Sequence, residues 1–159
     1  VSFTALSLLA YVFVFFFQVG NVTALCDGAL WWAAGRAVVV SVVHLGKSER
    51  HARRGGAALP PYEGRDTIGR LSTLVEQLDP GTVLCLGDSF DDDASANALI
   101  AEDRERLAQL PIGKKWIWIE GNHDPAPPAF GGEALAEVKL DPLTFRHIAS
   151  GASAEGSGH

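Results

Sequence analysis

The sequence predicts an α/β fold, because stretches typical of strands and helices alternate along the chain. Residues 37–45, 82–86 and 115–120 are short, apolar and rich in β-branched or aromatic side chains, as buried strands are. Between them, residues 66–78 carry apolar side chains at helical spacing, and residues 94–110 favour a second helix. This alternation is typical of parallel strands joined by crossover helices.

Length and composition set the broad class of the protein. The 159 residues suit one domain, and a hydrophobic content of 47% excludes general disorder. Two cysteines, Cys26 and Cys85, are too few for a disulfide scaffold. A formal net charge of −6 excludes a polycation that binds nucleic acid through bulk charge. A chain of this kind that acts on phosphates needs local cations, and metal ions are the obvious candidates.

The first half of the predicted domain holds one strand and one helix. The strand at residues 37–45 is followed by residues 46–61, which are rich in Arg, Gly and Pro and favour a loop. Asp66 is placed to cap a helix that runs to about Leu78, where an Asp-Pro-Gly turn ends it.

The second half holds the remaining strands. The strand at residues 82–86 ends at a Gly-Asp pair, and the strand at residues 115–120 ends at Gly-Asn-His-Asp. Two late strands are expected over residues 134–140 and 143–148, with a small polar loop over residues 150–159.

The apolar segment 1–25 is considered apart from the domain expected over residues 26–159. The run at residues 5–17 is rich in Val and Phe, which favours a buried strand or a pair of strands. It is shorter than the ~20 residues of a membrane-spanning helix. Its length also suits a signal-peptide core, although a positive n-region is missing. An erroneous gene start is a third interpretation.

Polar side chains follow the predicted strands at the edge where ligands collect in parallel sheets. Asp88 follows the second strand in VLCLGDSFDD, Asn122 and His123 follow the third in WIWIEGNHDP, and His44 lies near the end of the first. A carboxylate can bridge two cations, and imidazole binds transition metals or titrates near neutral pH. Each residue alone is also compatible with a turn or a structural role, but two neighbouring strands ending in GDSFDD and GNHD favour a metal site.

Three further residues extend this candidate site. Asp124 follows His123 directly and is expected to orient the imidazole through a hydrogen bond. His147 lies on a late predicted strand, and His159 ends the chain. Both add imidazole groups, which Zn, Fe, Mn and Ni accept as ligands.

The combined pattern H…GDxxD…GNHD…H…GH resembles the calcineurin-like metallophosphoesterase superfamily. Within it, residues 26–159 resemble the bacterial ligase-associated DNA-damage-response metallophosphoesterases. The segments that carry this likeness are AVVVSVVHLGK, HARRGGAALPPYEGRDTIGRL, VLCLGDSFDD, WIWIEGNHDPAPP and LTFRHI. The resemblance implies a four-layer α/β/β/α sandwich that is truncated at a GHxH motif and lacks its final strands.

The resemblance also implies an activity and a setting. The expected enzyme is a metal-dependent phosphoesterase that hydrolyses phosphodiester bonds, as a DNA endonuclease or phosphodiesterase in DNA repair. It would be cytoplasmic, with DNA as substrate, possible association with DNA ligase or helicase repair proteins, and no stable membrane partner. Two divalent metal ions are implied, with Mn expected first and Fe, Zn or Ni open.

The family roles transfer to matching positions of this sequence. Asp88 would bridge the two metals, and His123, paired with Asp124, would protonate the leaving group or steady the transition state. The residues that would complete one metal site are Asn122, His147 and His159. The other site would use His44, but the family's Asp is here Val42, and its last His lies beyond the end of the sequence.

Two alternative functions stay open from the sequence. The valine at position 42 and the ending at Gly-His are compatible with an inactive or single-metal remnant of such an enzyme. Residues 5–17 are compatible with a membrane-anchored or exported phosphatase.

A basic island within residues 47–65 is the remaining candidate site. Lys47, Arg53 and Arg54 are candidates for contact with substrate phosphate, because nucleic-acid backbones are bound mainly through such cations. The alternative is a loop whose charges simply face water.

Overall fold

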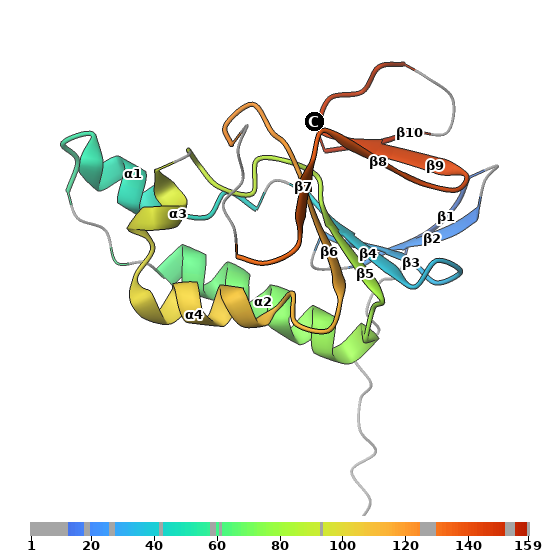
Figure 1. Cartoon of the computed structure of the whole chain (residues 1–159), viewed down its shortest axis with the longest axis horizontal. Helices are drawn as coiled ribbons and strands as arrows, with labels where there is room; N and C mark the ends of the chain where they lie inside the picture. The colour runs from blue at the N-terminus through green and yellow to red at the C-terminus, as the bar shows by residue number, and fades with distance from the viewer. Residues whose placement is uncertain are drawn as a thin grey trace, which may run out of the picture.

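A seven-stranded mixed sheet runs through the centre of the computed structural model (Figure 1). The structure describes residues 13–17, 20–25, 28–41, 43–57, 60, 62–92, 94–124, 130–151 and 155–158. Within them, the strands follow one another across the sheet in chain order: β1 (Phe13–Phe17), β2 (Gly20–Ala24), β3 (Leu30–Trp32), β4 (Ala37–Val40), β5 (Thr82–Cys85), β6 (Lys115–Ile119) and β7 (Glu133–Leu135).

Strand direction changes at β4. Strands β1 to β4 pair antiparallel through short connections, whereas β4, β5, β6 and β7 pair parallel. Parallel neighbours need a long crossover, and their carboxyl ends lie at the same edge of the sheet. The segments that follow β4, β5 and β6 therefore start side by side.

Helices fill the crossovers of the parallel part. Helices α1 (Lys47–Arg53) and α2 (Tyr62–Leu78) connect β4 to β5, and α3 (Ser95–Ala98) and α4 (Ala101–Gln109) connect β5 to β6. Helices α2 and α4 lie along the same face of the sheet (Figure 1). A cluster of buried side chains joins them to that face, including Ile68, Leu71 and Leu107.

The two central strands are buried on both faces, as the apolar sequences predict. Val83 and Trp116 pack with the helices, whereas Leu84 and Ile117 belong to a separate cluster on the opposite face. Continuous apolar strands are expected where both faces of a parallel sheet are covered.

A second sheet covers the face opposite the helices. It consists of β8 (Glu137–Leu140), β9 (Leu143–Arg146) and β10 (Glu155–Ser157), with β9 in the middle. Phe145 of β9 is buried against the central strands. The predicted mixed α/β fold is confirmed, and the layers of the described residues run helix, sheet, sheet.

Two predicted boundaries in the first crossover are wrong. The expected loop at residues 46–61 contains α1, which has few apolar side chains but forms ion pairs with the loop after β5. Helix α2 begins at Tyr62 rather than at Asp66. Asp66 lies inside the helix, where its carboxylate pairs with Arg70 one turn later.

Three later boundaries also differ. The helix predicted over residues 94–110 is divided, because Leu99 and Ile100 adopt extended backbone angles between α3 and α4. The strand predicted over residues 134–140 is divided into β7 and β8, which belong to different sheets. The loop predicted over residues 150–159 contains β10, which pairs with β9.

The amino-terminal segment contributes strands to the central sheet. β1 and β2 form an antiparallel pair at its edge; β1 lies within the run at residues 5–17 that was expected to form a strand or a pair of strands, whereas β2 follows that run. Residues 1–12 lie outside the described residues, as do Val42 and His159. Among the helices of the described residues, none has the length and hydropathy required to cross a membrane.

We predict that Leu107→Ala lowers the free energy of unfolding by about 2–5 kcal/mol, because it opens a cavity beneath α4. Leu107 is fully buried, whereas Ile112, just beyond the same helix, is 66% exposed. Ile112→Ala is therefore the control and should change stability by no more than about 0.5 kcal/mol. Urea unfolding of both variants measures the difference, and equal losses would contradict this packing.

Candidate metal centre

Two buried carboxylates connect the loops that follow β5 and β6. Asp88 Oδ1 accepts a hydrogen bond from the backbone N–H of His123, at 2.9 Å. In return, Asp124 Oδ2 accepts hydrogen bonds from the backbone N–H groups of Ser89 and Phe90, at 2.9 and 3.1 Å. We call this exchange the loop clasp. Since each loop supplies a carboxylate to the other, their relative position is fixed by charge-assisted hydrogen bonds.

Gly87 of GDSFDD and Gly121 of GNHD are required because neighbouring atoms of the chain lie too close to leave room for a side chain. A Cβ at Gly87 would lie 2.5 Å from His147 Nδ1, and one at Gly121 would lie 2.3 Å from the backbone nitrogen of Asp88. Real Cβ atoms do not come so close, so only glycine lets the histidine and the second loop pack against the Asp88 turn.

His44 and Asp88 both adopt left-handed backbone conformations. Their φ angles are 45° and 48°, which are uncommon for residues other than glycine. The backbone N–H of His44 donates to the carbonyl oxygen of Asp88, at 3.0 Å. Backbone strain of this kind is typical of functional sites. Here the two strained residues are the ones through which the loop after β4 contacts the loop clasp.

Three predicted metal ligands converge on one point. His147 Nε2 lies 2.7 Å from Asn122 Oδ1 and 3.4 Å from Asp88 Oδ2. His147 Nδ1 lies 2.9 Å from the carbonyl oxygen of Leu86, which can only accept a hydrogen bond, so Nδ1 carries the proton. In the neutral ring, the Nε2 lone pair then faces two oxygen atoms. A bound metal ion would satisfy this arrangement.

The donor set fits a divalent metal. One imidazole nitrogen, one amide oxygen and one carboxylate oxygen suit Mn, Fe, Zn or Ni without selecting strongly among them. A ligand histidine commonly donates its other N–H to a backbone carbonyl, as His147 does to Leu86. Gly158 lies beside this group, because its N–H donates to the carbonyls of Arg146 and His147. His159 follows it and lies outside the described residues.

A second group of side chains forms beside the first. Candidate ligand atoms of His44, Asp91 and His123 all lie within 4.8 Å of one another. The rings of the two histidines meet edge to face, with their centroids 5.3 Å apart. Asp91 is 4% exposed and forms an ion pair with Arg50 of α1.

Asp91 and Arg50 were missing from the predicted site residues. Asp91 is three residues beyond Asp88 in GDSFDD, so the run of aspartates was a usable signal. Arg50 could not be placed from the sequence, because the segment around it was expected to be a loop.

The predicted hydrogen bond from Asp124 to the His123 ring is wrong. One Asp124 oxygen is occupied by the loop clasp, and the other makes no hydrogen bond within the described part of the chain. The His123 ring instead places Nδ1 3.2 Å from the carbonyl oxygen of Asp91. Asp124 therefore positions the loops, and the Asp91 backbone orients the imidazole.

Burial dominates the electrostatics of Asp124. Loss of water raises its pKa from 3.8 to about 6, and the neighbouring Asp88 charge adds to the increase, while the backbone N–H groups of the loop clasp oppose it.

The three candidate phosphate contacts lie on or just after α1. Arg53 pairs with Asp92 and Ser95, so its charge is already compensated. Lys47 and Arg54 line a shallow cleft on α1. Their contact with substrate stays a prediction.

Residues 28–153 match the family of calcineurin-like phosphoesterases. The chain belongs to this family. It is therefore a hydrolase that acts on phosphate esters with divalent metal. Its structure is similar to the crystal structure of Pseudomonas putida nuclease MPE, with a TM-score of 0.74 and 25% sequence identity. The match covers 92% of this chain and 70% of that chain. No curated protein matches the sequence.

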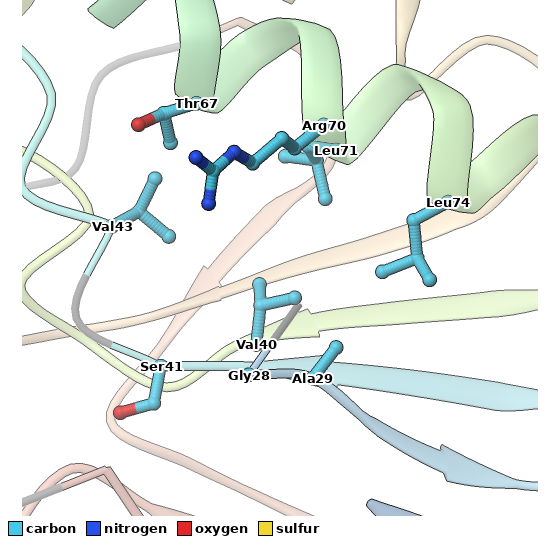
Figure 2. Close-up of a pocket in the computed structure, with 9 residues that line it drawn as sticks. All are labelled: Gly28, Ala29, Val40, Ser41, Val43, Thr67, Arg70, Leu71 and Leu74. Atoms are coloured by element: carbon cyan, nitrogen blue, oxygen red, sulfur yellow. The ribbon is translucent and has the colours of Figure 1, made fainter. Parts of the chain in front are cut away.

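A cleft of about 180 Å³ lies between α2 and the end of β4 in this phosphoesterase (Figure 2). Leu71 and Leu74 point from the helix toward the strands, and the Arg70 side chain extends toward Thr67 and Val43. The described residues that line the cleft include no imidazole or carboxylate. The cleft is therefore separate from the metal centre.

We predict that Asp124→Ala destabilises the metal-free phosphoesterase by roughly 2–4 kcal/mol, because two buried N–H groups lose their acceptor. Asp66→Ala is the control, since it removes only an exposed ion pair on α2 and should cost at most about 0.5 kcal/mol. Urea unfolding in the presence of a chelator measures both. Equal stability of the two variants would show that the loop clasp does not hold the fold together.

The raised pKa of Asp124 also predicts a pH dependence. Between pH 3.8 and about 6, the folded metal-free chain binds more protons at this group than the unfolded chain does. The contribution of Asp124 to the free energy of unfolding therefore falls as pH rises through this range. Asp124→Asn should remove that part of the fall, whereas Asp66→Asn should not. Urea unfolding from pH 4 to 7 tests this, and parallel curves for wild type and Asp124→Asn would contradict it.

Proposed function

We propose that this phosphoesterase cleaves phosphodiester bonds of DNA with a divalent metal held by Asp88, Asn122 and His147. The observation that supports this most directly is the His147 Nε2 atom, which faces one oxygen atom of the buried Asp88 and one of the exposed Asn122. The similarity to a structure described as a nuclease favours a nucleic-acid diester over other phosphate esters.

Each residue of the site has a distinct part in the proposed mechanism. A bound divalent metal would neutralise phosphate oxygens and lower the pKa of a water molecule. Asp88, Asn122 and His147 would hold it, and the loop clasp keeps Asp88 and Asn122 in place. The His123 ring is half-buried and so stays accessible to substrate. It would donate its Nε2 proton to the leaving oxygen while its Nδ1 bonds to the Asp91 carbonyl.

We also propose that two basic side chains on or beside α1 contact the phosphate backbone of the substrate. Lys47 and Arg54 provide positive charge in a chain whose formal net charge is −6. Contacts of this kind position a nucleic acid without reading its sequence. Arg53 is a weaker candidate, because Asp92 already compensates its charge.

The finer parts of the proposal rest on the sequence resemblance. The motif segments resemble bacterial ligase-associated enzymes, which supports two metal ions with Mn²⁺ as the preferred metal. It also supports a cytoplasmic role in DNA repair beside DNA ligase or helicase proteins.

We predict that hydrolysis of bis-p-nitrophenyl phosphate depends on Mn²⁺ and stops with EDTA. His123→Ala should lower the rate by ~10²–10⁴-fold, because the leaving oxygen loses its proton donor. Glu105→Ala is the control, since Glu105 is an exposed residue of α4 outside both the metal centre and the cleft lined by Lys47 and Arg54, and it should keep the wild-type rate. A metal-independent rate, or equal rates for the two variants, would contradict the mechanism.

Nicking of plasmid DNA under the same conditions tests the substrate. We expect Mn²⁺-dependent nicking that His123→Ala removes. Hydrolysis of the chromogenic diester without any cleavage of DNA would contradict DNA as the substrate while leaving the phosphodiesterase chemistry in place.

A further inference from the structure

Arg50 connects helix α1 to the loop that follows β5. Its guanidinium forms an ion pair with Asp91, which is 4% exposed. Ser48 is the buried residue of α1, so apolar packing contributes little to the position of this helix. The ion pairs with the loop after β5 therefore hold α1 in place, and Arg50 is the arginine that reaches the buried aspartate.

Asp91 is in turn the partner of the His123 ring. The carbonyl oxygen of Asp91 lies 3.2 Å from His123 Nδ1. A carbonyl oxygen only accepts hydrogen bonds, so it favours the ring form that carries a proton on Nδ1. The Nε2 atom is then the one that meets the substrate in the proposed mechanism. The position of the Asp91 carbonyl therefore decides how the His123 ring is oriented.

The Asp91 side chain depends on Arg50 for compensation of its charge. Its Oδ2 pairs with Arg50, whereas its Oδ1 lies 3.6 Å from His44 Nδ1, which is too long for a hydrogen bond. Its backbone N–H donates to the carbonyl oxygen of Leu45, at 2.9 Å. Without Arg50, a buried carboxylate would lose its paired cation, which is strongly unfavourable. We expect Asp91 to shift in response, and its carbonyl to leave His123.

We propose that Arg50 is a positioning residue for His123 and acts through Asp91. While α1 holds the carboxylate, the Asp91 carbonyl stays at His123 Nδ1. This inference rests on the proposed function, since it concerns the histidine that protonates the leaving oxygen. Arg50 also lines the shallow cleft on α1 that contains Lys47. The experiment therefore has to separate positioning from contact with substrate.

Steady-state hydrolysis of bis-p-nitrophenyl phosphate with Mn²⁺ makes this separation. Arg50→Gln should lower kcat by roughly 10–100-fold and leave KM within about twofold, because a displaced proton donor affects the transition state rather than substrate binding. Arg50→Lys should recover part of kcat, since lysine keeps a cation beside Asp91. A raised KM with the wild-type kcat would make Arg50 a substrate contact and overturn the inference.

Asp103→Asn is the control variant, because it also removes an ion pair between an arginine and a buried aspartate. Asp103 of α4 is 1% exposed, and its Oδ1 lies 3.6 Å from Arg65 Nε of α2, on the helical face of the sheet. This variant should keep the wild-type kcat, and urea unfolding measures the stability that each variant loses. An equal loss of kcat in Arg50→Gln and Asp103→Asn would reduce Arg50 to a general stabilising residue and overturn the inference.

A double-mutant cycle tests the route through Asp91. Asp91→Asn keeps the backbone carbonyl but removes the charge that pairs with Arg50, so it should lower kcat as well. The double variant Arg50→Gln/Asp91→Asn should be no slower than the slower of the two single variants. Losses that multiply would show that the two residues act independently, against the inference.

Nuclear magnetic resonance of the neutral His123 ring in the metal-free chain gives a readout besides activity. Two-bond ¹⁵N–¹H spectra show which ring nitrogen carries the proton, and the His123 signals are those missing from His123→Ala. Wild type and Asp103→Asn should have the proton on Nδ1, and Arg50→Gln should lose this preference. Should Arg50→Gln fail to fold, Asp91→Asn replaces it, and an unchanged preference for Nδ1 there would overturn the inference.

Failure of this inference and failure of the proposed function give different results. An Arg50→Gln chain that keeps the wild-type ring form and the wild-type kcat overturns the positioning role. A wild-type chain that holds the proton on His123 Nδ1, loses this preference in Arg50→Gln and hydrolyses no phosphodiester contradicts the proposed function alone.

Discussion

The rest of the centre depends on the loop clasp, in which the carboxylates of Asp88 and Asp124 accept backbone N–H groups from each other's loops. Parallel pairing of β5 and β6 brings these loops to one edge of the sheet, but pairing alone leaves the turns free to separate. The clasp fixes them with three hydrogen bonds and buries two negative charges beside Gly121. Burying these charges costs free energy, and this cost is seen in the raised pKa of the Asp124 carboxyl group.

The clasp forces electron-rich atoms together. With Asp88 fixed, its second oxygen lies beside Asn122 Oδ1 and His147 Nε2, and the Leu86 carbonyl determines which His147 nitrogen carries the proton. Such a cluster is stable when a cation occupies it. Metal binding at these residues would therefore be coupled to folding of the loops, as in other sites whose ligands repel one another in the free chain.

The sequence predicted what depends on local pattern. The buried strands were recognisable as apolar runs. Asp88 and Asn122 meet as expected because they follow the neighbouring parallel strands β5 and β6, and His147, which follows β9 of the second sheet, lies at the same point. What depends on tertiary contacts was missed. Helix α1 lacks an apolar stripe and is held by ion pairs from a distant loop, which also place Asp91. The role of Asp124 was misassigned because adjacency in sequence to His123 suggested a hydrogen bond that the loop clasp prevents.

The central claim is that the buried cluster around His147 is a metal site. Anomalous diffraction from crystals grown with Mn²⁺ tests it directly, because the ion is located without reference to activity. We expect an anomalous peak in contact with His147 Nε2, Asn122 Oδ1 and Asp88 Oδ2. Bound Mn²⁺ elsewhere in the crystal, with no anomalous peak at His147 Nε2, would contradict the account.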